Sequence, residues 1–86
     1  MNLTQSNWTK EELRSEIARL LETPVSNVTD KALFFGDIGI SSINVIIVLL
    51  FIEETFAMEI SDEEAENLST FGNVIEFLQK REMIAK

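Results

Sequence analysis

Apolar residues recur at helical spacing near the start of the chain. Leu13, Ile17, Leu20 and Leu21 form one stripe at positions i, i+4, i+7 and i+8, which is typical of an amphipathic helix. Thr9 and Glu12 have the spacing of a capping box. Trp8 stands where it would form a hydrophobic staple with Leu13. The chain's single proline closes the pattern, because the residue before a proline is driven out of the α region. Together these signals predict a helix over residues 10–22.

The next run of apolar residues would be apolar on more than one side of a helix. Between Ile43 and Ile52 there is one polar residue, Asn44, and no charge. On a helix over residues 42–56 the run makes two stripes, Val45, Leu49, Ile52 and Phe56 on one side and Ile43, Ile47, Leu50 and Glu54 roughly opposite. Since a domain this small can hardly bury both sides, we expect the first stripe to face the core and the second to face solvent. An exposed apolar patch of this kind usually marks a binding surface. The alternative is that the later helices cover both stripes.

Shorter signals organise the rest of the chain. Residues 24–41 form a long connection whose apolar content predicts an ordered loop over the core, with a turn or two of helix. Ser61 and Glu64 repeat the capping-box spacing and predict a short helix over residues 62–67. Thr70 precedes a last helix with the apolar stripe Phe71, Val74, Ile75 and Leu78. No segment alternates as a strand would. The predicted fold is all-α, a small four-helix bundle with three main helices and a short third one.

Composition limits the chemistry that such a bundle can perform. The 86 residues contain no cysteine and no histidine, so disulfides, thiolate metal sites and imidazole proton transfer are excluded. We therefore expect that the protein is not an enzyme and that it binds no metal ion. Residues 1–8 are expected to be flexible, and residues 9–86 to form one domain. No signal-peptide pattern is present and the apolar run is too short to span a bilayer, so we expect the protein in the cytoplasm.

The charge of the chain is strongly uneven. The formal net charge is −8, and no basic residue occurs between Ala32 and Gln79. A field of this sign repels nucleic acid and anionic membranes and attracts basic protein surfaces. The sequence therefore predicts a protein partner with a basic patch, while solubility alone is the alternative explanation.

Two adjacent serines precede the predicted second helix. Ser41 or Ser42 could cap that helix by accepting a hydrogen bond from a backbone N–H group. The same position favours a phosphate, because unpaired N–H groups and the helix dipole both stabilise negative charge. From position alone both roles remain open.

This stretch resembles the signature of the acyl carrier protein family, Asp-Leu-Gly-x-Asp-Ser-Leu. The signature here reads Asp37-Ile38-Gly39-Ile40-Ser41-Ser42-Ile43. The similarity continues through residues 53–56, 59–66 and 68–71 and covers about residues 9–82. The resemblance implies the acyl-carrier type of four-helix bundle, with a long ordered loop between the first and second helices.

The resemblance also implies a function and a set of partners. Ser42 would carry 4′-phosphopantetheine, whose thiol holds acyl or aminoacyl groups as thioesters. A phosphopantetheinyl transferase would attach this arm from coenzyme A with Mg²⁺. An acyl- or adenylate-forming loading enzyme and downstream synthase or transferase enzymes would then bind the carrier, which we expect to be a monomer without membrane insertion. The expected partner-recognition residues are Asp37, Ser41, Ile43, Asn44, Ile47, Leu50, Glu53, Glu54 and Glu59.

Departures from the family pattern favour a specialised pathway. Ser41, Asn44 and Ile47 stand where similar carriers of fatty acid synthesis commonly have Asp, Asp and Glu. We therefore expect a dedicated carrier of a fatty acid, polyketide or nonribosomal peptide pathway. The residues Leu49, Ile52, Phe56, Ile60, Leu68 and Ile75 would form either a plain core or a shelter for an acyl chain.

Three other classes of protein compete with the carrier interpretation. One is an unmodified helical interaction module that keeps the fold without the arm. A calcium sensor is excluded because the chain has no EF-hand loop. A small acidic hydrolase is disfavoured because no base lies near Ser42 in the sequence.

Overall fold

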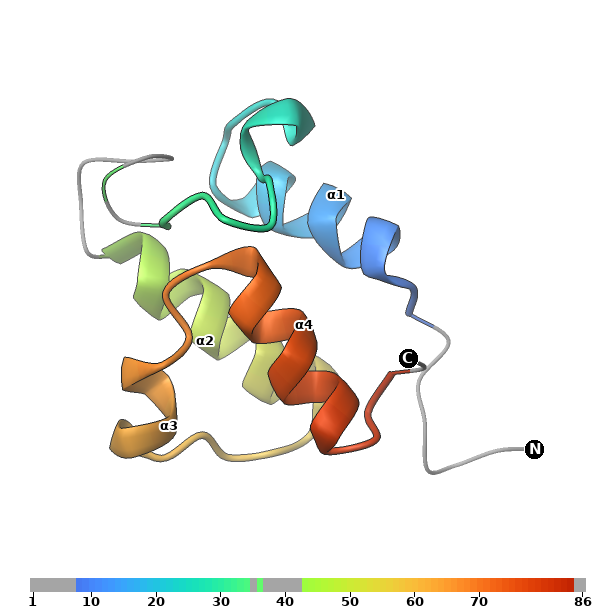
Figure 1. Ribbon diagram of the computed structural model, residues 1–86, viewed down its shortest axis with the longest axis vertical. Helices are drawn as coiled ribbons and strands as arrows, with labels where there is room; N and C mark the ends of the chain where they lie inside the picture. Colours follow the sequence, from blue (N-terminus) through green and yellow to red (C-terminus); the bar gives the residue numbers. More distant parts are fainter. Residues whose placement is uncertain (1–7, 35, 37–42, 85–86) are drawn as a thin grey trace.

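The computed structural model describes residues 8–34, 36 and 43–84. It consists of α1 (Lys10–Leu20), a 3₁₀ turn η1 (Val25–Asn27), α2 (Ile43–Phe56), α3 (Asp62–Glu66) and α4 (Phe71–Lys80). Figure 1 shows α4 in front of α2, with α1 above them and the short α3 at the lower left. Within the described ranges no strand forms, and an isolated bridge pairs Leu33 with Thr70. The all-α prediction with three main helices and one short helix is therefore confirmed.

The predicted caps of the first helix are present. Thr9 Oγ1 accepts a hydrogen bond from the Glu12 N–H at 3.1 Å, and the Glu12 carboxylate accepts one from the Thr9 N–H at 3.0 Å. The helix ends at Leu20, two residues earlier than predicted, because Glu22 has a left-handed backbone with φ 54°. The ring of Trp8 packs edge-on against Phe51 of α2, with centroids 5.8 Å apart. The staple between Trp8 and Leu13 stays a prediction.

The core is drawn from α1, α2, α4 and segments outside the helices, whereas α3 and η1 contribute none of its members. Its members have at most 9% of their surface exposed and are Leu13, Ile17, Ala18, Val28, Phe34, Val48, Ile52, Phe56, Leu68, Phe71, Val74, Ile75, Leu78 and Ile84. The whole predicted stripe of α4 lies among them. On α2 the prediction was partly wrong, because Val48 is central to the buried face whereas Val45 and Leu49 lie half-buried at its edges. The inward stripe of α2 is therefore Val48, Ile52 and Phe56, at the i, i+4, i+8 spacing of one helix face.

The opposite side of α2 is apolar and open. Ile43, Ile46 and Leu50 are 55%, 53% and 53% exposed, respectively. Ile47, which we predicted to be exposed, is half-buried. Residues three and four positions after Ile43 lie on the same face of a helix, so the spacing alone does not decide which of Ile46 and Ile47 is exposed. The alternative in which α3 and α4 cover both sides of α2 is excluded by these exposures.

The connection after α1 is an ordered loop over the part that the structure describes. Phe34 is fully buried, and its N–H donates to the carbonyl of Ser69 at 3.0 Å. The N–H of Gly72, in the first turn of α4, donates to the carbonyl of Asp30 at 2.9 Å. A Cβ at position 72 would lie 2.8 Å from that oxygen, so only glycine allows this approach. The loop is thus fastened to the start of α4 by backbone hydrogen bonds, a contact that the sequence did not predict.

The remaining caps follow the sequence signals. Ser61 and Glu64 form both halves of a capping box before α3, which is one residue shorter than predicted. Thr70 Oγ1 accepts the N–H of Asn73 at 3.1 Å at the start of α4. Because α3 buries none of its own residues, polar contacts and its capping box hold it in place.

Candidate functional site

The candidate site is the start of α2. Asp37, Ser41 and Ser42 lie outside the described residues, and α2 begins at Ile43, directly after Ser42 in the chain. The first turn of α2 carries no acidic residue. A negative group placed here would meet the positive end of the helix dipole and no carboxylate from this turn. This arrangement fits a phosphodiester on the preceding residue.

Asn44, which we expected in the recognition surface, makes a contact within the fold, and its recognition role stays a prediction. Its side-chain Nδ2 donates to the carbonyl of Phe34 at 3.2 Å, and the residue is half-buried. An amide group is used here inside the fold, between the first turn of α2 and the loop. Sequence reasoning missed this contact because nothing in the spacing of residues 34 and 44 signals it.

Glu53, for which we predicted a recognition role, also makes a contact within the fold. Its carboxylate accepts the N–H of Ile60 at 2.8 Å and so fixes the turn between α2 and α3. Ala57 in that turn has a left-handed backbone, with φ 51°. Glu54 and Glu59 are exposed, as recognition residues must be. Of the described residues in the predicted surface, Ile43, Leu50, Glu54 and Glu59 are accessible, and Ile46 joins them as a residue that the sequence did not single out.

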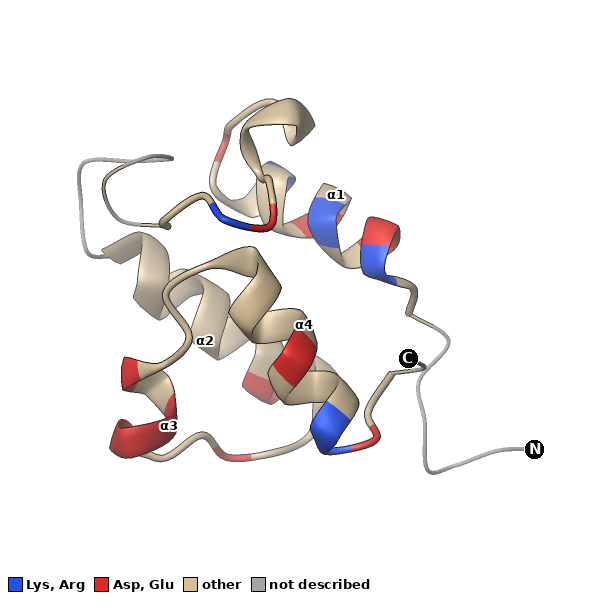
Figure 2. Cartoon of the chain, in the orientation of Figure 1, with Lys and Arg blue, Asp and Glu red and all other residues tan. Residues whose placement is uncertain are grey.

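Charge is divided between the helices. Figure 2 shows Lys and Arg on α1, on the connection after it and at the end of α4. The charged residues of α2 and α3 are all acidic. Two of the cations on α1 form ion pairs with a nearby carboxylate. Lys10 pairs with Asp30 at 2.8 Å, and Arg14 pairs with the same residue at 3.0 Å. The field around α2 and α3 is consequently negative, which favours an encounter with a basic protein surface.

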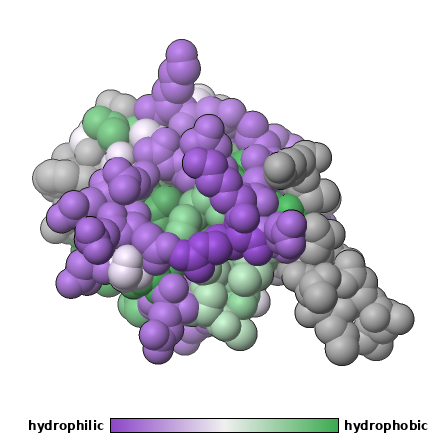
Figure 3. Space-filling model, turned by 60° about the horizontal axis from the view of Figure 1, so that its bottom comes forward, coloured by the Kyte–Doolittle hydropathy of each residue, from purple (hydrophilic) through white to green (hydrophobic). Residues whose placement is uncertain are grey.

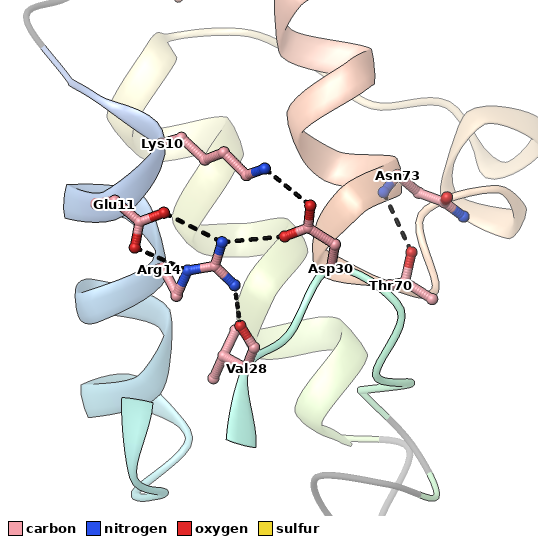
Figure 4. A network of polar contacts seen from close by, with 7 residues as sticks. All are labelled: Lys10, Glu11, Arg14, Val28, Asp30, Thr70 and Asn73. Atoms are coloured by element: carbon pink, nitrogen blue, oxygen red, sulfur yellow. Dashed lines mark hydrogen bonds and ion pairs between the residues drawn. The ribbon is translucent and has the colours of Figure 1, made fainter. Parts of the chain in front are cut away.

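Arg14 joins three parts of the molecule. Figure 4 shows its guanidinium between Glu11, Asp30 and the carbonyl of Val28. The group also lies 4.6 Å from the centre of the Phe71 ring. Hydrogen bonds from Lys10 and then from Arg14 lower the pKa of Asp30 below its ordinary value. The sequence signalled the Glu11–Arg14 pair by its spacing, but the link to the loop depends on how the chain folds back.

The interior residues suggested as an acyl shelter are mostly plain core. Ile52, Phe56, Leu68 and Ile75 are buried, and Leu49 and Ile60 pack against them half-buried. Among the described residues, two surface clefts border this group. One of about 290 Å³ is lined by Glu64, Leu68, Asn73 and Phe77 among others, and one of about 350 Å³ includes Lys10, Asp30, Ile75 and Gln79. Figure 3 shows one face of the molecule, where apolar atoms are recessed among hydrophilic side chains. These observations leave the sheltering of a cargo untested.

Comparison with known proteins gives the class of the molecule. Residues 11–78 match the family described as "Phosphopantetheine attachment site". This match covers most of the chain. The fold has four helices, and the helix that follows the serine has no acidic residue in its first turn. Together these features define a phosphopantetheine-dependent carrier domain.

A curated relative narrows this class. The acyl carrier protein of Helicobacter pylori (strain G27) is 32% identical over 73 residues, which is 85% of this chain and 94% of the relative. The chain therefore belongs to the acyl carrier protein family, whose cofactor is 4′-phosphopantetheine and whose members carry groups rather than catalyse reactions.

Two further findings concern the described residues only. They contain no group of three or more His, Cys, Asp or Glu side chains that could hold a metal ion. None of their helices combines the length and the apolar character needed to cross a membrane.

Proposed function

We propose that Ser42 is the attachment residue for 4′-phosphopantetheine and that the protein carries acyl or aminoacyl groups for a specialised pathway. The observation that carries this proposal is the family match, which spans residue 42, combined with the start of α2 directly after it. When attached, the arm supplies a thiol that holds the cargo as a thioester. Ser41 is not favoured, because the signature places a hydrophobic residue after the attachment serine and Ile43 follows Ser42.

The chain's own residues would support the arm in two ways. The first turn of α2 supplies N–H groups and dipole charge to the phosphate, with no carboxylate in that turn to oppose it. The buried face of α2, through Val48, Ile52 and Phe56, anchors the helix so that its start stays fixed relative to the other helices. A helix fixed in this way presents the arm from one defined point.

The open face of α2 is proposed as the partner surface. Ile43, Ile46 and Leu50 provide apolar contact, and Glu54 and Glu59 lie farther along as acidic contacts. Partners would be a phosphopantetheinyl transferase, a loading enzyme and downstream synthases or transferases in the cytoplasm. An aliphatic face in place of charge favours enzymes that dock through apolar residues, which is why a specialised fatty acid, polyketide or nonribosomal peptide pathway is preferred.

The attachment is tested by intact mass after incubation with coenzyme A, Mg²⁺ and a transferase of broad specificity. The parent and Ser41→Ala should each gain the mass of one phosphopantetheine, and Ser42→Ala should gain none. A gain that survives Ser42→Ala would overturn the assignment. No gain on the parent would instead favour an unmodified interaction module. The mass of protein purified from its own cells would then identify the cargo.

A further inference from the structure

Phe34 connects the starts of two helices through its backbone. Its N–H donates to the carbonyl of Ser69, which precedes the cap of α4, at 3.0 Å. Its carbonyl accepts from Nδ2 of Asn44, in the first turn of α2, at 3.2 Å. Its side chain is fully buried in the core. One buried residue therefore ties the beginning of α2 to the beginning of α4.

The contact made by Asn44 requires a side-chain donor. The Phe34 carbonyl is an acceptor, and among the side chains of this size an amide donates whereas a carboxylate only accepts. The contact is partly buried, so a lost donor leaves the carbonyl with less water to replace it. Leucine, with nearly the same shape, would also leave the carbonyl without this partner.

We propose that Asn44 is a positioning residue that holds the start of α2 in the arrangement needed for arm attachment. Asn44 stands two positions after Ser42 and forms a side-chain link between the first turn of α2 and the loop. The proposal rests on the proposed function of Ser42. Losing the link lowers the population of the reactive arrangement within the complex with the transferase, so the maximal rate falls while binding is largely kept.

The test compares two asparagines in matched positions. Asn44→Asp and Asn44→Leu both remove the donor, and only the first adds a charge. Asn73→Asp is the control, because Asn73 also lies in the first turn of a long helix and its Nδ2 donates to the carbonyl of Asn67 at 2.8 Å. The same chemical change is thus made at α4, away from the attachment serine in sequence. Rates of arm transfer are measured with coenzyme A and the transferase.

The expected result is a fall in kcat of about threefold or more for both Asn44 variants, with KM changed less, as the loss of one hydrogen bond predicts. The control should keep the parent's kcat. An equal loss in Asn73→Asp would reduce the effect to general destabilisation and overturn the proposal. A loss in Asn44→Asp without one in Asn44→Leu would assign the effect to charge and overturn it as well.

Hydrogen exchange of the protein without its arm gives an independent readout. The Phe34 amide should exchange faster in both Asn44 variants than in the parent, because the residue is then held from one side only. Unchanged exchange would contradict the positioning role even if attachment occurs. If the parent accepts no arm at all, the proposed function fails, yet the exchange measurement still decides whether Asn44 holds the start of α2.

Discussion

Helices α2 and α4 both contain a run of apolar residues, and they use it differently. On α4 the apolar residues Phe71, Val74, Ile75 and Leu78 are buried, and the exposed positions are polar or charged. On α2 three residues are buried, while Ile43, Ile46 and Leu50 remain about half exposed. An apolar residue on a small bundle therefore belongs either to the core or to a surface that awaits a partner. The face it occupies decides which.

The two helices also start differently. Helix α4 begins at a threonine cap and at a glycine that allows the Asp30 carbonyl to approach. Helix α2 begins at Ile43, directly after the serine pair in the chain, and its first turn is joined to the loop by the side chain of Asn44. The start of α4 serves the fold, whereas the start of α2 is where the chain is proposed to carry its arm.

The largest expected effect comes from comparing one isoleucine on the buried side of α2 with one on its exposed side. Ile52→Ala should lower the free energy of unfolding by about 3 kcal/mol, because it leaves a cavity in the core. Ile46→Ala, on the same helix, should change it by less than about 0.5 kcal/mol, since this side chain is half exposed. Urea denaturation measures both. Similar losses in the two variants would show that the exposed face is covered in solution.

A smaller effect concerns binding. Ile46→Glu should weaken the complex with a cognate pathway enzyme by about tenfold while leaving the free energy of unfolding nearly unchanged, because the charge enters an apolar contact. Glu66→Gln, on the exposed side of α3, serves as the control for a change of charge. Titration of the carrier against the enzyme measures the affinity. Unaltered affinity for Ile46→Glu would remove the open face of α2 from the partner surface.

The smallest effect comes from the ion pairs that join α1 to the loop. Lys10 and Arg14 lower the pKa of Asp30, so the stabilisation by its carboxylate is present above the ordinary Asp pKa and is lost as pH falls through the lowered one. Asp30→Asn should cost less than about 1 kcal/mol at pH 7, because the pairs are partly exposed. The difference from the parent should shrink at acidic pH and in high salt.

Denaturation of the parent and Asp30→Asn between pH 7 and pH 3 checks this expectation. A difference that stays constant over this range would mean that the ion pairs contribute nothing and that other contacts, such as the backbone bond from Gly72, hold the loop.

Much of the fold was predictable because its signals are local. The capping boxes at Thr9 and Ser61 and the apolar stripe of α4 appear where the sequence placed them. The predictions on α2 were less accurate, because a helix that is apolar nearly all round contains no internal sign of which side faces the core. The contacts that Asn44 and Glu53 make within the fold were missed for a related reason. A polar side chain near a predicted binding surface is equally compatible with solvent and with a backbone partner ten or seven residues away.

The sequence by itself determined the helices, the caps, the negative charge and the family signature, since each depends on neighbours within a few residues or on composition. Tertiary structure alone decided that Val48 lies inside and Ile46 outside, that Gly72 meets Asp30, and that Asn44 ties α2 to Phe34. These contacts join residues far apart in the chain or depend on which side of a helix meets the core. Close packing selects one such arrangement for the whole molecule, and no local pattern specifies it.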